Sequence, residues 1–189
     1  DGSYPLHFQG NEYGRLNAEN VWARIMERNW DWGEPGVLFI DRINETNPLF
    51  YLERIDATNP CGEQPLPANG ACLLGSLNIV KYLVPHWSGN GVVEAGHEID
   101  YDLLRRDIKT AVRAFDNVID KSSYPRPQQR AEQQQKRRMG IGVTGMANAL
   151  EIMSHSYASP SYLEQQSKIL STIRDTAYAT SVELATEKG

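Results

Sequence analysis

A proline- and glycine-rich stretch over residues 56–75 constrains this chain more than any other feature. The stretch contains both cysteines, Cys61 and Cys72, and it lacks the regular spacing of apolar residues that marks a helix or a strand. A structureless loop of this length is uncommon inside a compact domain unless it serves a function. We therefore interpret residues 56–75 as a long structured loop that carries a functional site.

Helices are expected on both sides of this loop. Asn17 is a good N-cap for a helix over 18–30, and Asp100 is a good N-cap for a helix over 101–120. Ser159 followed by Pro160 predicts the start of a last long helix that ends near Gly189. Further helices are expected after Ser76 as far as residue 83, over 126–138 with an exposed, polar surface, and over 145–153.

Two short apolar segments predict strands. Residues 37–40 form an uninterrupted apolar run bounded by turn residues, which is typical of a strand buried on both faces of a parallel sheet. Residues 139–143 predict a second strand that contains glycine. Residues 1–16 are expected to be an irregular N-terminal loop, and 85–99 a polar surface insertion. Two or three parallel strands do not complete a sheet, so we expect a segment of a larger α/β architecture, or one closed by a partner chain.

Charge and composition exclude several classes of protein. The formal net charge is −5, which argues against a general nucleic-acid binder. No apolar run approaches the length of a membrane span, and the N-terminus lacks the features of a secretion signal. The four histidines lack metal-ligand spacing. We therefore expect a cytoplasmic protein that contacts neither membrane nor nucleic acid and has no metal site.

The strongest candidate site lies around the first cysteine. In an extended segment, Asn59, Cys61 and Glu63 would point to the same side of the chain. An amide, a thiol and a carboxylate in one pocket can bind vicinal hydroxyls, move a proton and perform sulfur chemistry. The alternative is a buried structural cysteine beside a solvated glutamate. The alignment of Asn59 with Glu63, and the presence of Cys72 on the same loop, favour the functional interpretation.

Residues 58–75, which include Asn-Pro-Cys-Gly-Glu-Gln-Pro-Leu and Gly-Ala-Cys-Leu-Leu-Gly, resemble the finger loop of the ribonucleotide reductase catalytic subunit. Flanking motifs over 34–44, 115–125 and 137–145 resemble the same family in order and spacing. The Gly-Glu-Gln-Pro-Leu variant looks most like the adenosylcobalamin-dependent (class II) branch. The resemblance implies a partial ten-stranded α/β barrel with an interior finger loop, as a segment of a larger catalytic domain.

The resemblance assigns residues 1–189 to one segment of that barrel domain. It implies a strand, the finger loop and a short helix over 34–83, helices and a glycine-containing strand over 100–153, and a helix over 159–189. It also implies roles for four side chains. Cys61 would become a thiyl radical, Glu63 would take the 3′-hydroxyl proton, Asn59 would hydrogen-bond the ribose hydroxyls, and Cys72 would be half of a reducing dithiol.

The same resemblance implies cofactors and partners. The substrate would be a ribonucleoside di- or triphosphate, the cofactor adenosylcobalamin, and the external reductant a dithiol protein such as thioredoxin or glutaredoxin. Because Cys61 is the only other cysteine, the dithiol partner of Cys72 would come from the rest of the reductase or from a split subunit. We therefore expect the chain alone to be inactive. The alternatives are a class I subunit, whose radical comes from a metal-containing small subunit, and a non-catalytic fragment that completes a partner's barrel.

Two further patterns are given structural interpretations. Gly140, Gly142 and Gly145 match the G-x-G-x-x-G pattern of dinucleotide-binding folds, but no hydrophobic strand precedes them. We expect these glycines to allow close packing of a strand against a helix. The basic run over 130–138 is interpreted as a solvated helix face.

Overall fold

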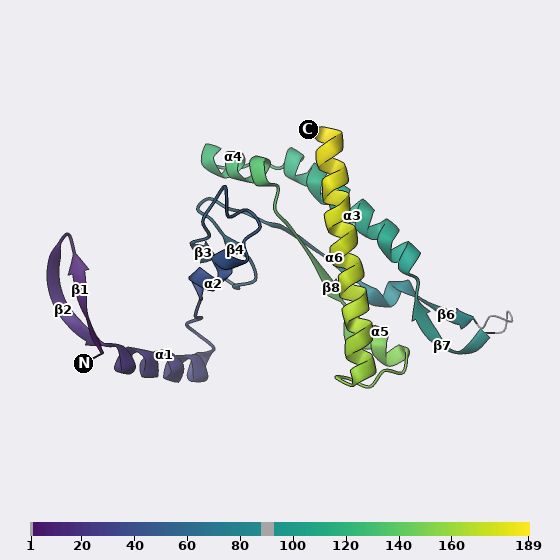
Figure 1. The fold of residues 1–189 in the computed structure, drawn as a ribbon, viewed down its shortest axis with the longest axis horizontal. Helices are drawn as coiled ribbons and strands as arrows, with labels where there is room; N and C mark the ends of the chain where they lie inside the picture. Colours follow the sequence, from purple (N-terminus) through teal and green to yellow (C-terminus); the bar gives the residue numbers. More distant parts are fainter. Residues whose placement is uncertain (1, 88–92) are drawn as a thin grey trace. The chain divides into compact units, whose positions relative to one another are not determined.

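The structure, a computed structural model, describes residues 2–87 and 93–189. The chain forms two compact units, Asp1–Ala68 and Asn69–Gly189 (Figure 1). The loop predicted over 56–75 therefore begins in the first unit and ends in the second. Each unit is described separately below.

The first unit begins with an antiparallel hairpin of strands β1 (Ser3–Phe8) and β2 (Asn11–Asn17). The irregular loop predicted over 1–16 is therefore wrong. Gln9 and Gly10 both have positive φ, 48° and 81°, which is the turn geometry that joins hairpin strands. Tyr4, Leu6 and Phe8 alternate along β1, and this period of two was the signal in the sequence.

Helix α1 (Ala18–Trp32) follows the hairpin and confirms the predicted helix, with a slightly later end. The Asn17 side chain accepts a hydrogen bond from the backbone N–H of Asn20 at 3.0 Å, which caps the N-terminus. At the other end Gly33 takes the left-handed conformation and its N–H donates to the Asn29 carbonyl at 2.8 Å. Both ends of the helix are thus set by local sequence.

The strand predicted over 37–40 is wrong. Residues 34–39 lie outside helices and strands, and Ile40 begins the short helix α2 (Ile40–Glu45). Val37, Leu38 and Phe39 remain 43%, 46% and 58% exposed. A strand needs a neighbouring strand to satisfy its backbone groups, and in the described part of the chain this run pairs with none. The first unit ends with the small antiparallel pair of β3 (Ala57–Thr58) and β4 (Pro65–Leu66).

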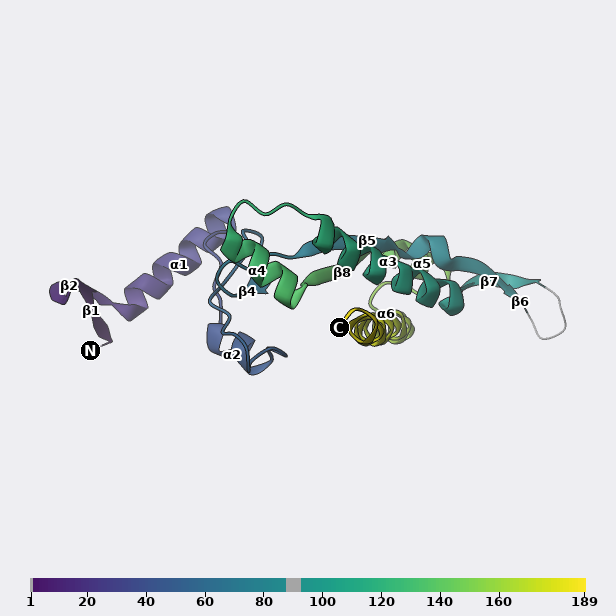
Figure 2. The ribbon, with the colours of Figure 1, turned by 90° about the horizontal axis from the view of Figure 1, so that it is seen from above.

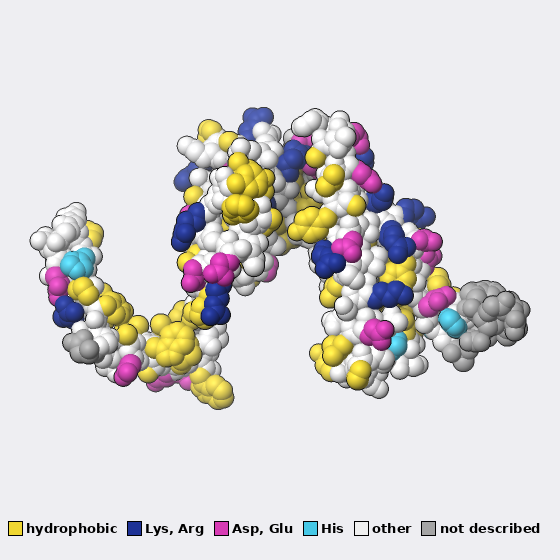
Figure 3. All heavy atoms as spheres, in the orientation of Figure 1, with side chains coloured by type: hydrophobic (Ala, Val, Ile, Leu, Met, Phe, Trp, Pro, Cys, Tyr) yellow, Lys and Arg dark blue, Asp and Glu magenta, His cyan; other side chains and the backbone are white. Residues whose placement is uncertain are grey.

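Aromatic side chains are exposed over the hairpin and helix α1, where hydrophobic atoms gather at the surface (Figure 3). Trp30 is 90% exposed, Trp32 77% and Tyr13 70%. Exposed apolar surface of this extent normally packs against another part of a protein or a partner.

The second unit is built on a parallel pair of strands, β5 (Leu73–Asn78) and β8 (Met139–Thr144). The register runs from Leu73 opposite Met139 to Asn78 opposite Thr144. The pair confirms the predicted strand over 139–143. The helix predicted to start at Ser76 is wrong, because Ser76 lies within β5. Instead Asn78 caps the 3-10 helix η1 (Ile79–Tyr82), accepting a hydrogen bond from the Val80 N–H at 3.2 Å.

Over the residues described in this unit, the remaining elements are a hairpin and four helices. Strands β6 (Leu83–Trp87) and β7 (Val93–Ile99) pair antiparallel, so the surface insertion predicted over 85–99 is a hairpin where the structure describes it. The part of that prediction over 88–92 lies outside the described residues. The four predicted helices are confirmed as α3 (Tyr101–Lys121), α4 (Pro127–Lys136), α5 (Met146–Ile152) and α6 (Pro160–Lys188).

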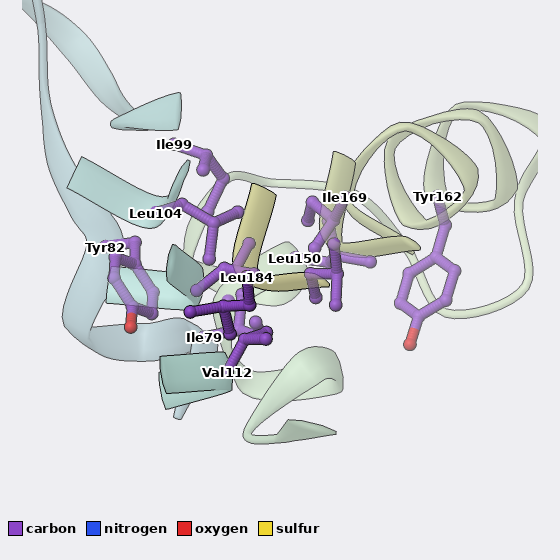
Figure 4. Packing of buried hydrophobic residues seen from close by; sticks show 12 residues of the cluster. Ile79, Tyr82, Ile99, Leu104, Val112, Leu150, Tyr162, Ile169 and Leu184 are labelled. Carbon is purple, nitrogen blue, oxygen red and sulfur yellow. The ribbon is translucent and has the colours of Figure 1, made fainter. Parts of the chain in front are cut away.

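Helices α3 and α6 pack together beside the parallel pair (Figures 1 and 2). The core gathers side chains from η1, α3, α5 and α6 (Figure 4), and its fully buried members include Ile79, Leu104, Ile108, Leu150 and Ile169. Burying a side chain of this size stabilises a fold by roughly 1.5–3 kcal/mol. This cluster therefore holds the helices onto the strands.

The predicted close packing of a strand against a helix is confirmed at Gly145, the N-cap of α5, where a Cβ would lie 2.8 Å from the side-chain oxygen of Asn78 at the end of β5. Gly142 serves a different contact. A Cβ at Gly142 would lie 3.0 Å from the Ser76 hydroxyl oxygen, so this glycine allows close approach to the neighbouring strand β5 and not to a helix. A further close approach of strand to helix, which was not predicted, occurs at Gly75, where a Cβ would lie 2.1 Å from the ring of Phe115 on α3.

The architecture confirms an α/β chain with a parallel strand pair. Each sheet formed by the described residues has two strands, and they do not close into a barrel. None of the described helices combines the length and apolar character needed to cross a membrane.

Candidate functional site

The segment around Cys61 is a tight turn that joins β3 to β4. The Asn59 N–H donates to the Gln64 carbonyl at 3.3 Å, and the Gly62 N–H donates to the Asn59 carbonyl at 3.0 Å. Gly62 has φ +81°, a conformation that residues with a side chain rarely adopt. The extended segment expected here is therefore wrong, because these hydrogen bonds fold the chain back on itself.

This turn brings Asn59 and Glu63 into direct contact. The Asn59 amide nitrogen donates to a Glu63 carboxylate oxygen at 2.5 Å, and the Asn59 amide oxygen accepts from the Gln64 N–H at 3.0 Å. Both ends of the Asn59 side chain are thus used, which fixes its orientation. The amide and the carboxylate predicted to share one side do so, although the turn and not strand alternation places them together.

Cys61 lies in the same turn, between Asn59 and Glu63 along the chain. The Cys61 thiol is exposed, as is the Glu63 side chain. An exposed thiol, a carboxylate and an oriented amide within five consecutive residues form a surface that a hydroxyl-bearing ligand can approach.

Cys72 belongs to the second unit, directly before β5. Its side chain is half-buried, and its thiol donates to the Leu73 carbonyl at 3.7 Å. Cys72 therefore precedes the first residue of β5, Leu73, whose backbone pairs with β8.

A network of charged side chains in the second unit was not predicted. Asp116 on α3 is 4% exposed, and its carboxylate accepts from Arg137 Nε at 2.5 Å and pairs with Lys188 near the end of α6. Asp120 pairs with the same two cations, at 2.8 Å from Arg137 and 3.0 Å from Lys188. The signal in the sequence was an acidic residue four positions after Val112, on the buried face of an amphipathic helix.

Electrostatics in this network favour charged forms. Burial alone would raise the pKa of Asp116, but hydrogen bonds from Arg137 and Lys188 outweigh it and lower that pKa below its ordinary value. The hydrogen bond to Asp116 likewise raises the pKa of Arg137. Asp116 is therefore a carboxylate at neutral pH.

The solvated face predicted over 130–138 is wrong at its C-terminal end. Glu132 accepts from Lys136 at 2.6 Å and from Arg138 at 3.2 Å, and all three side chains are at most 16% exposed. Buried charges are retained only where they are paired, which explains how a polar segment lies against the fold.

Among the residues that the structure describes, no group of three or more His, Cys, Asp or Glu side chains could hold a metal ion. The candidate site in the first unit thus consists of Asn59, Cys61 and Glu63.

The family model for the ribonucleotide reductase barrel domain matches residues 4–189. The chain belongs to the ribonucleotide reductase family. The predicted family is therefore confirmed over almost the whole chain, and the matched region includes all four candidate residues.

Two curated relatives within this reductase family are identical to the chain at more than a third of the aligned residues. The chain is 38% identical over 175 residues to the vitamin B12-dependent ribonucleoside-diphosphate reductase of Thermoplasma acidophilum, covering 93% of this chain and 22% of the relative. It is 34% identical over 180 residues to the protein of the same name from Mycobacterium tuberculosis, covering 95% and 24%. The chain therefore spans only about a quarter of the length of these relatives.

A solved structure in the reductase family has the same fold. The class Id ribonucleotide reductase alpha subunit of Actinobacillus ureae matches with a TM-score of 0.64 at 23% identity, over 91% of this chain and 32% of that one. The arrangement of helices and strands described above is thus a segment of a reductase alpha subunit fold.

Proposed function

We propose that this chain is the radical-bearing segment of an enzyme that reduces ribonucleotides to 2′-deoxyribonucleotides. The observation that carries the proposal is the hydrogen bond between Asn59 and Glu63, in a turn that also contains the exposed Cys61. Membership of the reductase family gives this amide, thiol and carboxylate a reaction in which each has a use.

In the proposed reaction Cys61, as a thiyl radical, removes the hydrogen atom from the ribose 3′ carbon and becomes a thiol. Glu63 accepts the proton of the 3′-hydroxyl, while Asn59 hydrogen-bonds the ribose hydroxyls. The bond from the 2′ carbon to oxygen then breaks, and the oxygen leaves as water. The contact at 2.5 Å between Asn59 and Glu63 supports this assignment, because it holds the acceptor in place before substrate arrives.

The electrons for this reduction come from a dithiol of which Cys72 is one half. Two thiols lose two electrons and two protons and form a disulfide, and the ribose loses its 2′ oxygen as water. The sulfur atom of Cys61 returns the hydrogen to the 3′ carbon at the end. Because the chain contains two cysteines in all, the second sulfur of the dithiol comes from the remainder of the reductase or a partner subunit.

The cofactor we infer is adenosylcobalamin, because the relatives at 34–38% identity are named vitamin B12-dependent reductases. When bound, this group would supply the radical. Cys61 fits such a source by its chemistry, since a thiol is the side chain in this turn that can give up a hydrogen atom and hold the radical on sulfur. The inferred substrate is a ribonucleoside diphosphate, again from the names of these relatives, and a dithiol protein such as thioredoxin or glutaredoxin would restore the reduced state.

The test is turnover by the chain assembled with the remainder of its reductase. Cys61→Ser should abolish deoxyribonucleotide formation while leaving assembly intact, and Ala57→Ser, an exposed change in the same hairpin, should leave turnover unchanged. Turnover that requires adenosylcobalamin favours the class II assignment, and turnover that requires a metal-containing small subunit favours class I. Undiminished turnover by Cys61→Ser would show that this chain only completes the barrel.

A further inference from the structure

The backbone beside Cys72 is tied to strand β8 where that strand begins. The Leu73 N–H donates to the Arg138 carbonyl at 3.2 Å, and the Cys72 thiol donates to the Leu73 carbonyl at 3.7 Å. Leu73 also lies opposite Met139, the first residue of β8. The position of the Cys72 sulfur therefore depends on where the Arg138 carbonyl is held.

Helix α4 holds that carbonyl from the other side. Gln133 is 3% exposed, and its side-chain amide donates to the Arg138 carbonyl at 3.1 Å. The chain then reverses at Arg137, which has φ 50° and ψ 46° and whose N–H donates to the Gln133 carbonyl at 2.8 Å. A residue with a side chain rarely adopts this left-handed conformation, so other contacts must stabilise it.

The side chain of Arg137 supplies those contacts. Its Nε donates to the Asp116 carboxylate at 2.5 Å, one terminal nitrogen donates to the Asp116 backbone carbonyl at 2.8 Å, and the same nitrogen lies 2.8 Å from an Asp120 oxygen. A planar guanidinium that makes several such bonds fixes orientation as well as position. The buried carboxylate of Asp116 thereby anchors the junction of α4 and β8 to helix α3.

We propose that Arg137 is a positioning residue for Cys72, and that Asp116 holds it in that role. This inference rests on the proposed function, in which Cys72 is half of a dithiol. A disulfide forms only when two sulfur atoms reach about 2.0 Å and adopt a restricted dihedral angle. A small displacement at the start of β5 therefore matters for Cys72 more than for a residue whose role is packing.

The chain offers a matched control for this contact. Arg113 on α3 pairs with Glu187 on α6 at 2.5 Å, and both side chains are about half exposed. This pair also joins an arginine to a carboxylate between elements of the second unit, but it does not touch β8. Asp116, Arg137 and Lys188 line a cavity of about 290 Å³. Methionine is smaller than arginine, so Arg137→Met introduces no clash with these neighbours.

The experiment compares the full chain with Arg137→Met, Arg137→Lys and Arg113→Met. Backbone amide exchange is measured at Leu73 and Leu77. The amides of both residues point toward β8, because the direction of the backbone N–H alternates with a period of two along a strand. Alkylation by iodoacetamide is measured at Cys72, with the exposed Cys61 as an internal standard. Arg137→Met should speed exchange at Leu73 by at least about tenfold, leave Leu77 within about threefold, and speed alkylation of Cys72 by at least about fivefold.

Arg137→Lys keeps the positive charge but cannot form the several hydrogen bonds that the guanidinium makes to Asp116 and Asp120. It should therefore speed amide exchange at Leu73 and alkylation of Cys72 by a smaller factor than Arg137→Met does. It carries the test if Arg137→Met does not fold. The proposal is overturned if Leu73 and Cys72 in the folded variants match the parent, if Leu77 changes as much as Leu73, or if Arg113→Met gives the same effect. Neither readout needs turnover, so these outcomes are independent of the proposed function. The proposed role of Cys72 in the dithiol would instead fail if the Cys72→Ser variant of the assembled reductase kept full turnover.

Discussion

The Asn59 amide nitrogen lies 2.5 Å from a carboxylate oxygen of Glu63, and Cys61 is in the turn between them. The hydrogen bond uses one carboxylate oxygen and leaves the other available to a ligand. The Asn59 amide oxygen accepts a hydrogen bond from the Gln64 backbone N–H, so the backbone of the turn holds the Asn59 side chain in place. The site is therefore oriented before any substrate is present.

Glu63→Gln tests the carboxylate as a proton acceptor. The glutamine keeps the size of the side chain and can still accept from Asn59, but it cannot take a proton. We expect kcat to fall by about 10²–10⁴-fold with little change in KM, because the loss falls on the step after binding. Steady-state kinetics of the assembled reductase measures both constants.

The control for this variant is Asp56→Asn, which removes an exposed carboxylate from the same segment. It should leave kcat unchanged. If Glu63→Gln raises KM and spares kcat, Glu63 binds substrate without moving a proton.

Gly62→Ala tests the turn that brings the pair together. Gly62 has φ +81° with open space around its Cβ position, so alanine meets no clash but must adopt a strained backbone. The strain costs about 1–2 kcal/mol. We expect faster exchange of the hydrogen-bonded Asn59 amide and lower kcat.

Gly36→Ala is the matched control for the turn. Gly36 also has open space around it, and its φ lies outside the left-handed region. Equal amide exchange at Asn59 in the two variants would contradict the role assigned to Gly62.

Cys72→Ser tests the dithiol. A serine hydroxyl cannot form a disulfide, so the reducing equivalents are lost while the chemistry at Cys61 can still begin. We expect release of hydrogen from the ribose 3′ carbon without multiple turnovers of deoxyribonucleotide. Repeated turnover at the parent rate would remove Cys72 from the reaction.

The buried carboxylate of Asp116 predicts a dependence of stability on pH. Its pKa in the folded chain lies below the ordinary value of 3.8, so its ion pairs stabilise the fold fully above that value. This contribution declines as pH falls through the lowered pKa of the folded state. Asp116→Asn should therefore lower the free energy of unfolding near neutral pH and flatten its fall below pH of about 4, as measured by urea unfolding.

The exposed pair of Arg113 and Glu187, which lies outside this network, supplies the control for that measurement. Arg113→Met, at the exposed pair with Glu187, should leave the free energy of unfolding and its dependence on pH close to those of the parent, because solvent screens an exposed ion pair. A parent chain whose stability in acid falls no faster than that of Asp116→Asn would contradict the assignment.

Local sequence signals predicted the helices well because their ends are set by neighbouring residues. Asn17 caps α1 and Asp100 caps α3 through side chains that bond to amides two or three positions later. The run over 37–40 could not be assigned this way, since its apolar residues fit a strand only where a neighbouring strand exists.

Long-range contacts explain what else was missed. Asp116 meets Arg137 and Lys188, which are 21 and 72 positions away, and no periodicity links such residues. At the candidate site the residue types were predictable, because Asn59, Cys61 and Glu63 lie within one short motif. Their geometry was not, since it depends on the positive φ of Gly62 and the pairing of β3 with β4.

The central claim is that Cys61 removes the hydrogen from the ribose 3′ carbon. The most direct measurement is the rate of turnover of the assembled reductase with substrate carrying deuterium at that carbon, beside unlabelled substrate. We predict slower single-turnover reduction of the labelled substrate, and no reduction of either substrate by Cys61→Ser. Equal rates for the two substrates in single turnover, together with undiminished reduction by Cys61→Ser, would contradict the account.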